Sequence, residues 1–279
     1  DKLFLSSYIL VLAGVVLVYV DTSLYRPFDA PVLLYLLYAV TLVCIFSIDR
    51  IELSVLLVAI TGLIHRATVY YSSAIQVGLD PLFHTTAAAR IANSGQLTPL
   101  AYSKYWYSPV YHLLTAVTAG GLGISVRDAA FLTTTVIGTV VPVVAIALFL
   151  TRVWNTQIGA IGAFLFVAAR RSVEQAVNTG PKTLGIALFV VLVVLTITYL
   201  ESDTQSRSVL SVLVPVLVVL VFTHQFSLFV TAVVLSVYTA TQSLWRGWPG
   251  RKEITIWGLM LAAVLFQTSI TKYDGPAGG

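Results

Sequence analysis

Residues that could do chemistry gather in one stretch of this chain, Gly78-Leu79-Asp80-Pro81-Leu82-Phe83-His84. Asp80 and His84 are four residues apart, so on a helix their side chains would lie on the same face. A carboxylate placed there can act as a general base or, with the imidazole, as a ligand of a divalent cation. Two ligands do not complete a metal site, and a His84 satisfied by one hydrogen bond is the plainer alternative. Asp80 before Pro81 is also an ordinary helix start with the carboxylate as N-cap, and this role is compatible with chemistry.

The composition places this stretch in a membrane protein. Of the 279 residues, 58% are hydrophobic and 10% are charged, and the mean hydropathy is +0.91. A transmembrane helix needs about 20 mostly apolar residues. Nine runs come near that length: residues 3–20, 32–48, 53–70, 129–151, 153–169, 183–200, 209–223, 226–244 and 254–271. The sequence therefore predicts an all-α protein, a polytopic transmembrane helical bundle of about nine spans without Asp, Glu, Lys or Arg in their interiors.

Two short helices are predicted in the long loop that follows the third run. The first begins at Asp80 and ends at Asn93-Ser94-Gly95, and about 14 mostly polar residues are too few to cross a bilayer. The second runs from Ser108-Pro109 to the cluster Gly120-Gly121-Leu122-Gly123. It is apolar but about half a span long, so we expect it at the membrane surface. The aromatic residues before and at its start are typical of an interfacial belt, with a stacking surface for a sugar or isoprenoid as the alternative: Tyr102, Tyr105, Trp106, Tyr107 and Tyr111.

Charge and cysteine usage exclude some classes of function. The net charge of +4 does not indicate a nucleic-acid partner. Cys44 is the single cysteine, which excludes an intrachain disulfide and a cysteine-rich metal site. If the long loop is external, the Lys and Arg residues divide almost evenly between the two sides, so the positive-inside rule selects no orientation. Either the orientation is the reverse, a span is miscounted, or external basic residues bind an anion.

An acidic loop residue, two interfacial helices and a helical bundle together resemble the GT-C superfamily of membrane glycosyltransferases, which includes oligosaccharyltransferases, protein O-mannosyltransferases and aminoarabinose transferases. The resemblance covers roughly residues 53–244. The two spans before residue 53 depart from the usual plan, in which the acidic loop follows the first helix. The matching segments are the stretch from Gly78 to His84, Arg90-Ile91-Ala92-Asn93-Ser94-Gly95, Tyr107-Ser108-Pro109-Val110-Tyr111-His112-Leu113-Leu114 and Thr223-His224-Gln225.

The resemblance implies a domain plan and a function. Residues 1–52 would be two extra N-terminal transmembrane helices, and residues 53–270 a GT-C-like transmembrane domain whose long loop, 65–127, carries the interfacial helices. Residues 271–279 would begin a loop or a further C-terminal region. The protein would be a multi-pass protein of the cell membrane that moves a sugar from a polyprenyl phosphate or pyrophosphate carrier to an acceptor on the external face. Its partners would be membrane lipid, the lipid-linked sugar and further protein subunits.

The resemblance also gives candidate site residues. Asp80, the only acid between Glu52 and Asp128, would be the base or would hold a Mg or Mn ion with His84. Glu174 would be a second acid, and the alternative is a solvated charge balanced by neighbouring arginines. Contacts to the carrier phosphate would come from basic side chains, each of which alone is more often an interfacial charge: Arg90, Arg170, Arg171, Lys182 and, with a polar turn as alternative, His224. Lys182 follows Gly180-Pro181, where a helix N-terminus would also favour an anion.

A different class of function stays open from the residues alone. The chain could be a non-enzymatic membrane scaffold, or a lipid-binding or transport subunit of a larger complex. Coupled transporters place ionisable residues inside their spans. The expected absence of such residues argues against ion coupling but not against a passive scaffold.

Overall fold

The structure, a computed structural model, describes residues 2–20, 29–72, 79–101, 103–202 and 206–271. All regular structure in these ranges is helical, which confirms the predicted all-α class. The chain divides into two compact units. The first comprises Asp1–Gln76 and Thr139–Val177, and the second comprises Val77–Gly138 and Asn178–Gly279.

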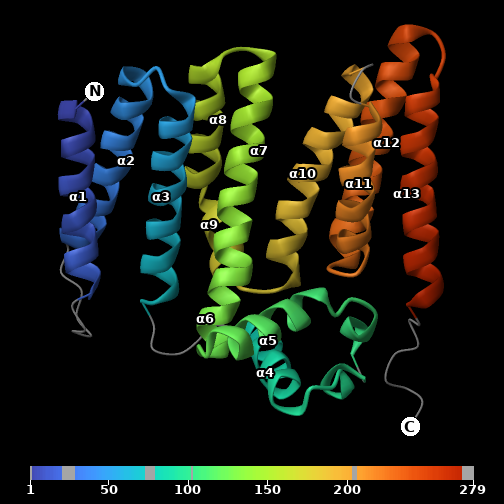
Figure 1. The fold of residues 1–279 in the computed structure, drawn as a ribbon, viewed down its shortest axis with the longest axis horizontal. Coiled ribbons are helices and arrows are strands. Elements are labelled where there is room, and N and C mark those ends of the chain that lie inside the picture. Colours follow the sequence, from blue (N-terminus) through green and yellow to red (C-terminus); the bar gives the residue numbers. More distant parts are fainter. Residues whose placement is uncertain (1, 21–28, 73–78, 102, 203–205, 272–279) are drawn as a thin grey trace. The chain divides into compact units, whose positions relative to one another are not determined.

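The first unit is built from long helices that pack side by side (Figure 1). Its core helix α3 (Ile51–Tyr70) packs against α2 and α8. A Cβ on Gly62 of α3 would lie 2.7 Å from Val167 Cγ1, so this glycine permits the close approach of α3 and α8. The other helices of this unit are α1 (Lys2–Val20), α2 (Asp29–Ser47), α7 (Ile137–Val153, from Thr139), α8 (Thr156–Ala168) and α9 (Arg170–Val177).

The second unit combines four long helices with a group of short ones. The long helices are α10 (Pro181–Glu201), α11 (Ser206–Val221), α12 (Gln225–Arg246) and α13 (Arg251–Ile270). They enclose an apolar core in which Leu192, Leu213, Leu228 and Ile256 are fully buried. The short elements are α4 (Leu79–Ser94), η1 (Thr98–Leu100), η2 (Lys104–Tyr107), α5 (Val110–Leu122), α6 (Val126–Ala130) and the π-helical η3 (Phe131–Val136).

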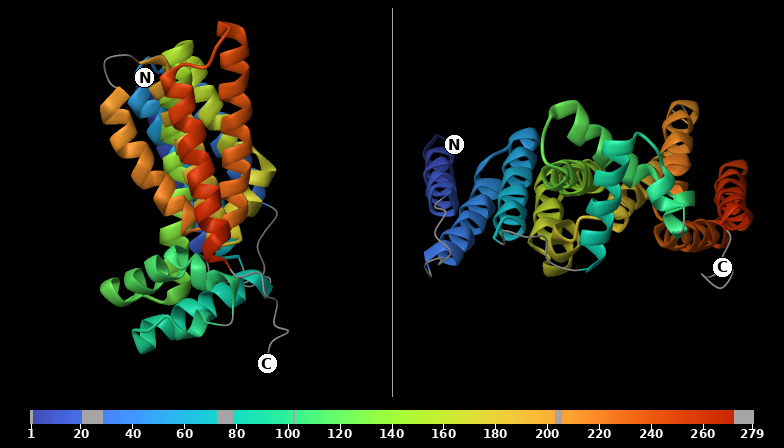
Figure 2. Two further views of the ribbon diagram at one scale, coloured as in Figure 1. Left: turned by 90° about the vertical axis from the view of Figure 1, so that its right-hand side faces the viewer. Right: turned by 90° about the horizontal axis from the view of Figure 1, so that it is seen from below.

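The helices α4 and α5 lie across one end of the long helices of their unit (Figure 2). Two contacts fasten α5 there. The Val110 N–H donates to Phe222 O at 3.1 Å, and the Gln267 Nε2 donates to Ser108 Oγ at 3.3 Å. The N-terminus of α5 is thereby fixed to the ends of α11 and α13.

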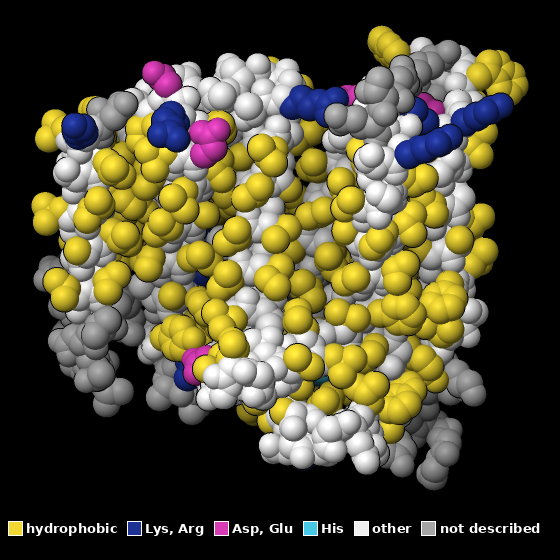
Figure 3. Space-filling view, in the orientation of Figure 1, with side chains coloured by type: hydrophobic (Ala, Val, Ile, Leu, Met, Phe, Trp, Pro, Cys, Tyr) yellow, Lys and Arg dark blue, Asp and Glu magenta, His cyan; other side chains and the backbone are white. Residues whose placement is uncertain are grey.

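Five helices of the described residues are long and apolar enough to cross a membrane, so the protein is a membrane protein. They are Ile51–Tyr70, Val126–Val153, Pro181–Glu201, Gln225–Trp245 and Arg251–Ile270. Hydrophobic side chains cover the visible helix flanks, and most visible charged side chains lie at helix ends (Figure 3). The other four predicted spans coincide with helices whose described apolar parts are shorter: Lys2–Val18, Pro31–Ser47, Thr156–Ala168 and Ser206–Val221.

Both predicted short helices are present. Helix α4 has 16 residues, slightly more than expected, and it begins at Leu79, so Asp80 lies inside its first turn and is not the predicted N-cap. Gly95 and Gly123 follow α4 and α5 with φ angles of 67° and 63°, a left-handed conformation that ends a helix. One expectation is wrong: α3 includes Arg66, whose side chain is fully buried, so the spans are not free of charged residues.

Candidate functional site

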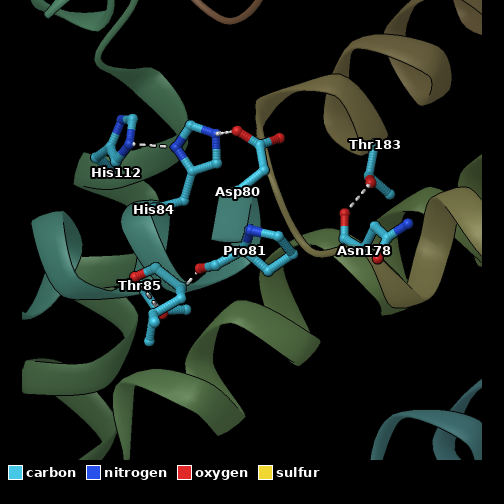
Figure 4. A network of polar contacts seen from close by, with 8 residues as sticks. Asp80, Pro81, His84, Thr85, His112, Asn178 and Thr183 are labelled. Carbon is cyan, nitrogen blue, oxygen red and sulfur yellow. Dashed lines mark hydrogen bonds and ion pairs between the residues drawn. The ribbon is translucent and has the colours of Figure 1, made fainter. Parts of the chain in front are cut away.

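The second unit brings Asp80 and His84 together on one face of α4. The Asp80 Oδ1 lies 3.4 Å from His84 Nε2, longer than a strong hydrogen bond and within ion-pair reach. The two side chains differ sharply in exposure, at 82% for Asp80 and 1% for His84. In Figure 4 the carboxylate points at the imidazole ring, which lies between Asp80 and His112. A substrate can therefore reach the carboxylate but not the imidazole.

A second imidazole, His112 on α5, completes a row of three groups. The His84 Nδ1 and His112 Nε2 are 2.9 Å apart, and His112 is fully buried. If the neutral His84 ring donates its Nε2–H to Asp80, its Nδ1 must accept the Nε2–H of His112. The His112 Nδ1 then carries a lone pair and no proton. It has no hydrogen-bond partner among the described residues. In this tautomer the His84 Nε2–H faces the Asp80 carboxylate, and His112 holds the other nitrogen of the ring.

Burial sets the protonation state of His112. Desolvation first, and the neighbouring His84 second, lower the pKa of His112 from 6.5 to about 3. His112 is therefore neutral near pH 7, as its role in the row requires. We had not predicted His112 as a site residue. Its only signal in the sequence was a polar side chain in an otherwise apolar short helix, and its partner is 28 residues away.

Aromatic rings and a glycine enclose the two histidines. The His84 ring centroid is 4.6 Å from that of Tyr105 and 5.5 Å from that of Tyr111. Burial first, and the Asp80 charge second, raise the pKa of Tyr105 to about 12. A Cβ on Gly180 would lie 3.2 Å from His84 Cδ2, so the start of α10 also lies against this ring. Tyr105 and Tyr111 hence wall the site, while Tyr102 lies outside the described residues.

Of the predicted basic residues, Lys182 lies near the row formed by Asp80, His84 and His112. It is exposed in the first turn of α10, two residues after the glycine that contacts His84. The N-cap Gly180 has no side chain to bond the first N–H groups of α10. The helix dipole and these N–H groups add positive potential beside Lys182.

Arg90 lies away from Asp80. The two residues are ten positions apart on the straight helix α4, about 15 Å along its axis. Arg90 lines a different hollow of about 440 Å³ near the C-terminal end of α4. The other residues of that hollow are polar or proline: Asn93, Ser94, Gln96, Thr98 and Pro99.

His224 has a structural role at the start of α12. Its Nδ1 accepts from the backbone N–H of Ser227 at 3.2 Å and lies 2.8 Å from Ser227 Oγ. This is an N-cap, which agrees with the polar-turn alternative. A further contact of His224 with a carrier phosphate stays a prediction.

Glu174 belongs to the first unit, in α9, and pairs with its two arginine neighbours. The Arg170 Nε lies 2.7 Å from Glu174 Oε1, and the Arg171 Nη1 lies 3.0 Å from Oε2. Hydrogen bonds from Arg170 and then Arg171 lower the pKa of Glu174. This is the balanced surface charge foreseen as the alternative. A role of Glu174 as second acid, and of Arg170 and Arg171 as phosphate contacts, stays a prediction.

The predicted metal pair has two facing ligand atoms but no third. No group of three or more His, Cys, Asp or Glu side chains that could hold a metal ion occurs within the described residues. A Mg or Mn ion on Asp80 and His84 would take its remaining ligands from water or a substrate phosphate, as Mg²⁺ commonly does.

Comparison of the chain with protein-family models, with curated proteins and with solved structures finds no match.

Proposed function

We propose that the protein is a GT-C-like glycosyltransferase of the cell membrane, in which all nine predicted hydrophobic helices cross the bilayer. It would move a sugar from a polyprenyl phosphate or pyrophosphate carrier to an acceptor at the external face. One observation carries the proposal: an exposed Asp80 carboxylate beside a buried histidine pair, on a short helix that lies across the ends of long apolar helices. A site so placed suits a substrate that has one end in lipid and the other in water.

The row of three groups suits a general base. The acceptor hydroxyl oxygen attacks the anomeric carbon, its proton passes to Asp80, and the bond from that carbon to the phosphate oxygen breaks with its electron pair on the phosphate. His84 orients the carboxylate, and neutral His112 holds His84 in the required tautomer. Asp80 is the member of the row that a substrate can touch, because the histidines are buried.

The start of α10 suits the departing phosphate. Negative charge develops on that group as the glycosidic bond breaks, and fixed positive groups that meet it lower the barrier. Lys182 and the first N–H groups of α10 supply such charge in the same unit as Asp80. In the alternative arrangement, in which His84 Nε2 carries a lone pair and not a proton, a divalent cation held by Asp80 and His84 would supply more of the same stabilisation. Arg90, about 15 Å along α4 from Asp80, is better suited to a remote part of the substrate.

The carrier also needs a place for its hydrocarbon chain. A hollow of about 360 Å³ lies between α11 and α13 and is lined only by apolar residues, among them Leu217, Phe222, Leu259 and Phe266. Phe222 accepts the N–H of Val110 at the start of α5. The hollow therefore extends from the end of the long helices at which the site helices are fastened, as a lipid-linked substrate requires.

Native mass spectrometry of the purified protein tests the proposal. The parent and an Asp80→Asn variant are incubated with a polyprenyl-phosphate sugar and a membrane extract as source of acceptor. We expect both proteins to bind the carrier, and only the parent to consume it. Asp128→Asn is the matched control, because Asp128 is a partly exposed acid in the same unit whose carboxylate accepts from the Ser125 hydroxyl. It should keep full turnover.

Two results would speak against the proposal. Equal turnover by parent and Asp80→Asn would remove Asp80 from the chemical step. Carrier bound by neither protein, with no turnover, would favour the scaffold, lipid-binding or transport subunit, and recovery in a stable complex with other chains would support that function further.

A further inference from the structure

A hollow with a largely apolar lining surface lies in the first unit, at one end of α2 and α3, and not in the unit that contains Asp80. Its volume is about 270 Å³. Three of its eight lining side chains are apolar, and the other five carry a hydroxyl or imidazole group: Tyr35, Tyr38, His65, Thr68 and Ser72. Ser72 lies two residues beyond the end of α3, a span by its length and composition. The hollow is hence at the depth where lipid headgroups meet water.

Hydrogen bonds inside the wall decide which atoms face a ligand. The Tyr38 hydroxyl donates to Val167 O at 3.1 Å and lies 2.9 Å from His65 Nδ1. Because the Tyr38 proton is used in the bond to Val167 O, the contact with His65 requires His65 Nδ1–H to donate to the Tyr38 oxygen. A neutral imidazole carries one proton, so His65 Nε2 is then an acceptor. Ser72 Oγ donates to Val69 O at 2.6 Å, so its oxygen also presents lone pairs. The polar part of the wall therefore offers acceptor atoms on His65 and Ser72, and it suits a ligand with hydrogen-bond donors.

A buried cation behind this wall argues against a cationic ligand. Arg66 is fully buried, and its Nη1 lies 3.5 Å from the Val167 oxygen that also accepts from Tyr38. Its other bonds go to Gly62 O at 2.9 Å and Ser172 Oγ at 2.7 Å. No carboxylate pairs with Arg66 among the described residues. Its charge would repel an ammonium group in the adjacent hollow, where solvent screens little.

A phosphate is disfavoured for a different reason. Among the described residues, no Lys or Arg lines the hollow. Arg66 cannot turn to an anion there without giving up bonds to the last turn of α8, whose carbonyls have no helical partner. An anion would meet the lone pairs of His65 and Ser72 instead. A neutral ligand meets neither objection.

We propose that this hollow binds the neutral polyhydroxyl headgroup of a membrane lipid, such as a sugar linked to diacylglycerol. Several hydroxyl donors match the several acceptors of the wall, whereas a sterol offers a single hydroxyl. Tyr35, with 74% of its surface exposed, offers an aromatic face for the apolar side of a sugar ring. The inference rests on the first unit and does not depend on the proposed transferase function.

Native mass spectrometry with lipids of identical acyl chains tests this site. The protein is held in a detergent without a sugar headgroup and offered glucosyl-diacylglycerol, diacylglycerol, phosphatidylglycerol or phosphatidylcholine. We expect the glucosyl lipid to bind about tenfold more tightly than the other three, a difference of about 1.4 kcal/mol. Free methyl glucoside should compete only weakly, which separates a headgroup site from a site for free sugar.

Substitutions in the wall locate the binding. Tyr35→Ala and His65→Phe should each remove most of the tenfold preference. Phe46→Ala is the matched control for Tyr35→Ala, because Phe46 is an exposed aromatic residue at the other end of α2. Tyr35 is too exposed for its loss to unfold the protein. Equal binding of all four lipids, a preference for either phospholipid, tight binding of free sugar, or a preference that Tyr35→Ala leaves intact would each overturn the inference.

Discussion

The buried histidine pair makes the stability of the protein depend on pH in a way that one substitution can isolate. The pKa of His112 is about 3 in the folded protein and 6.5 when the chain is unfolded. Between these values the unfolded chain binds the proton and the folded chain does not. The free energy of unfolding therefore rises with pH through this window and falls as the solution is made acidic.

The size of the effect follows from the same two values. At pH 7.5 neither state is appreciably protonated at His112. At pH 5.5, one unit below the unfolded pKa, the unfolded state gains about 1.4 kcal/mol from protonation. We expect the parent protein to lose that amount of stability between pH 7.5 and pH 5.5, beyond any loss shared with a variant that has no imidazole at this position.

The assay is unfolding in mixed micelles with increasing dodecyl sulfate, measured at both pH values for the parent and His112→Leu. The variant should be less stable at pH 7.5 but lose about 1.4 kcal/mol less on acidification. Glu174→Gln is the control. The pKa of Glu174 is lowered from 4.5, so protonation of this carboxylate changes the stability only at pH values below the interval from 7.5 to 5.5. An equal pH dependence in the parent and His112→Leu would refute the buried neutral state of His112.

Three further predictions concern packing and hydrogen bonds, and mixed-micelle unfolding checks each. In a double-mutant cycle, His84→Leu and His112→Leu should each cost about 1–3 kcal/mol by leaving one imidazole without its partner, while the double variant costs clearly less than their sum; additivity within about 0.5 kcal/mol would argue against the bond. Gly62→Ala should destabilise by about 1–3 kcal/mol, because its Cβ would lie 2.7 Å from Val167; Gly120→Ala, with open space at its Cβ, is the control. Arg66→Met should cost about 1–3 kcal/mol by removing the hydrogen bonds of Arg66 to Gly62 O, Val167 O and Ser172 Oγ; an unchanged free energy would contradict a stabilising role of these bonds.

The sequence allowed prediction of local features that follow from length and periodicity. The all-α class, the helix α4 and the helix α5 with its glycine end follow from apolar runs, Pro81 and the turn glycines. Five of the nine predicted spans meet the length of a bilayer, and the count of nine stays a prediction. The division into two units was not foreseen, because it depends on which helices pack together and not on their individual patterns.

The parts of the site that the sequence could not reveal are tertiary contacts. His112 meets His84 because α5 packs on α4, and Gly180 meets the same ring from a segment almost a hundred residues later. The interiors of the predicted spans were expected to hold no charged residue, yet in the folded unit Arg66 is fully buried and its Nη1 donates to Val167 O of α8. Spacing alone shows neither which polar group is buried nor which partner compensates it.

The exposed fractions of their side chains give Asp80 and His84 different roles, although their spacing places both on one helix face. Asp80 and His84 share a helix face, and on that ground either could have been the base or both could have been metal ligands. Since His84 has 1% of its side chain exposed and a second imidazole on its other nitrogen, it cannot meet an acceptor directly. The Asp80 side chain is 82% exposed, so its carboxylate can contact an acceptor. Under the proposed function, removing the carboxylate should therefore abolish turnover and leave the fold intact. Removing either imidazole should lower both the turnover and the stability of the fold, since the histidines hold α4 against α5.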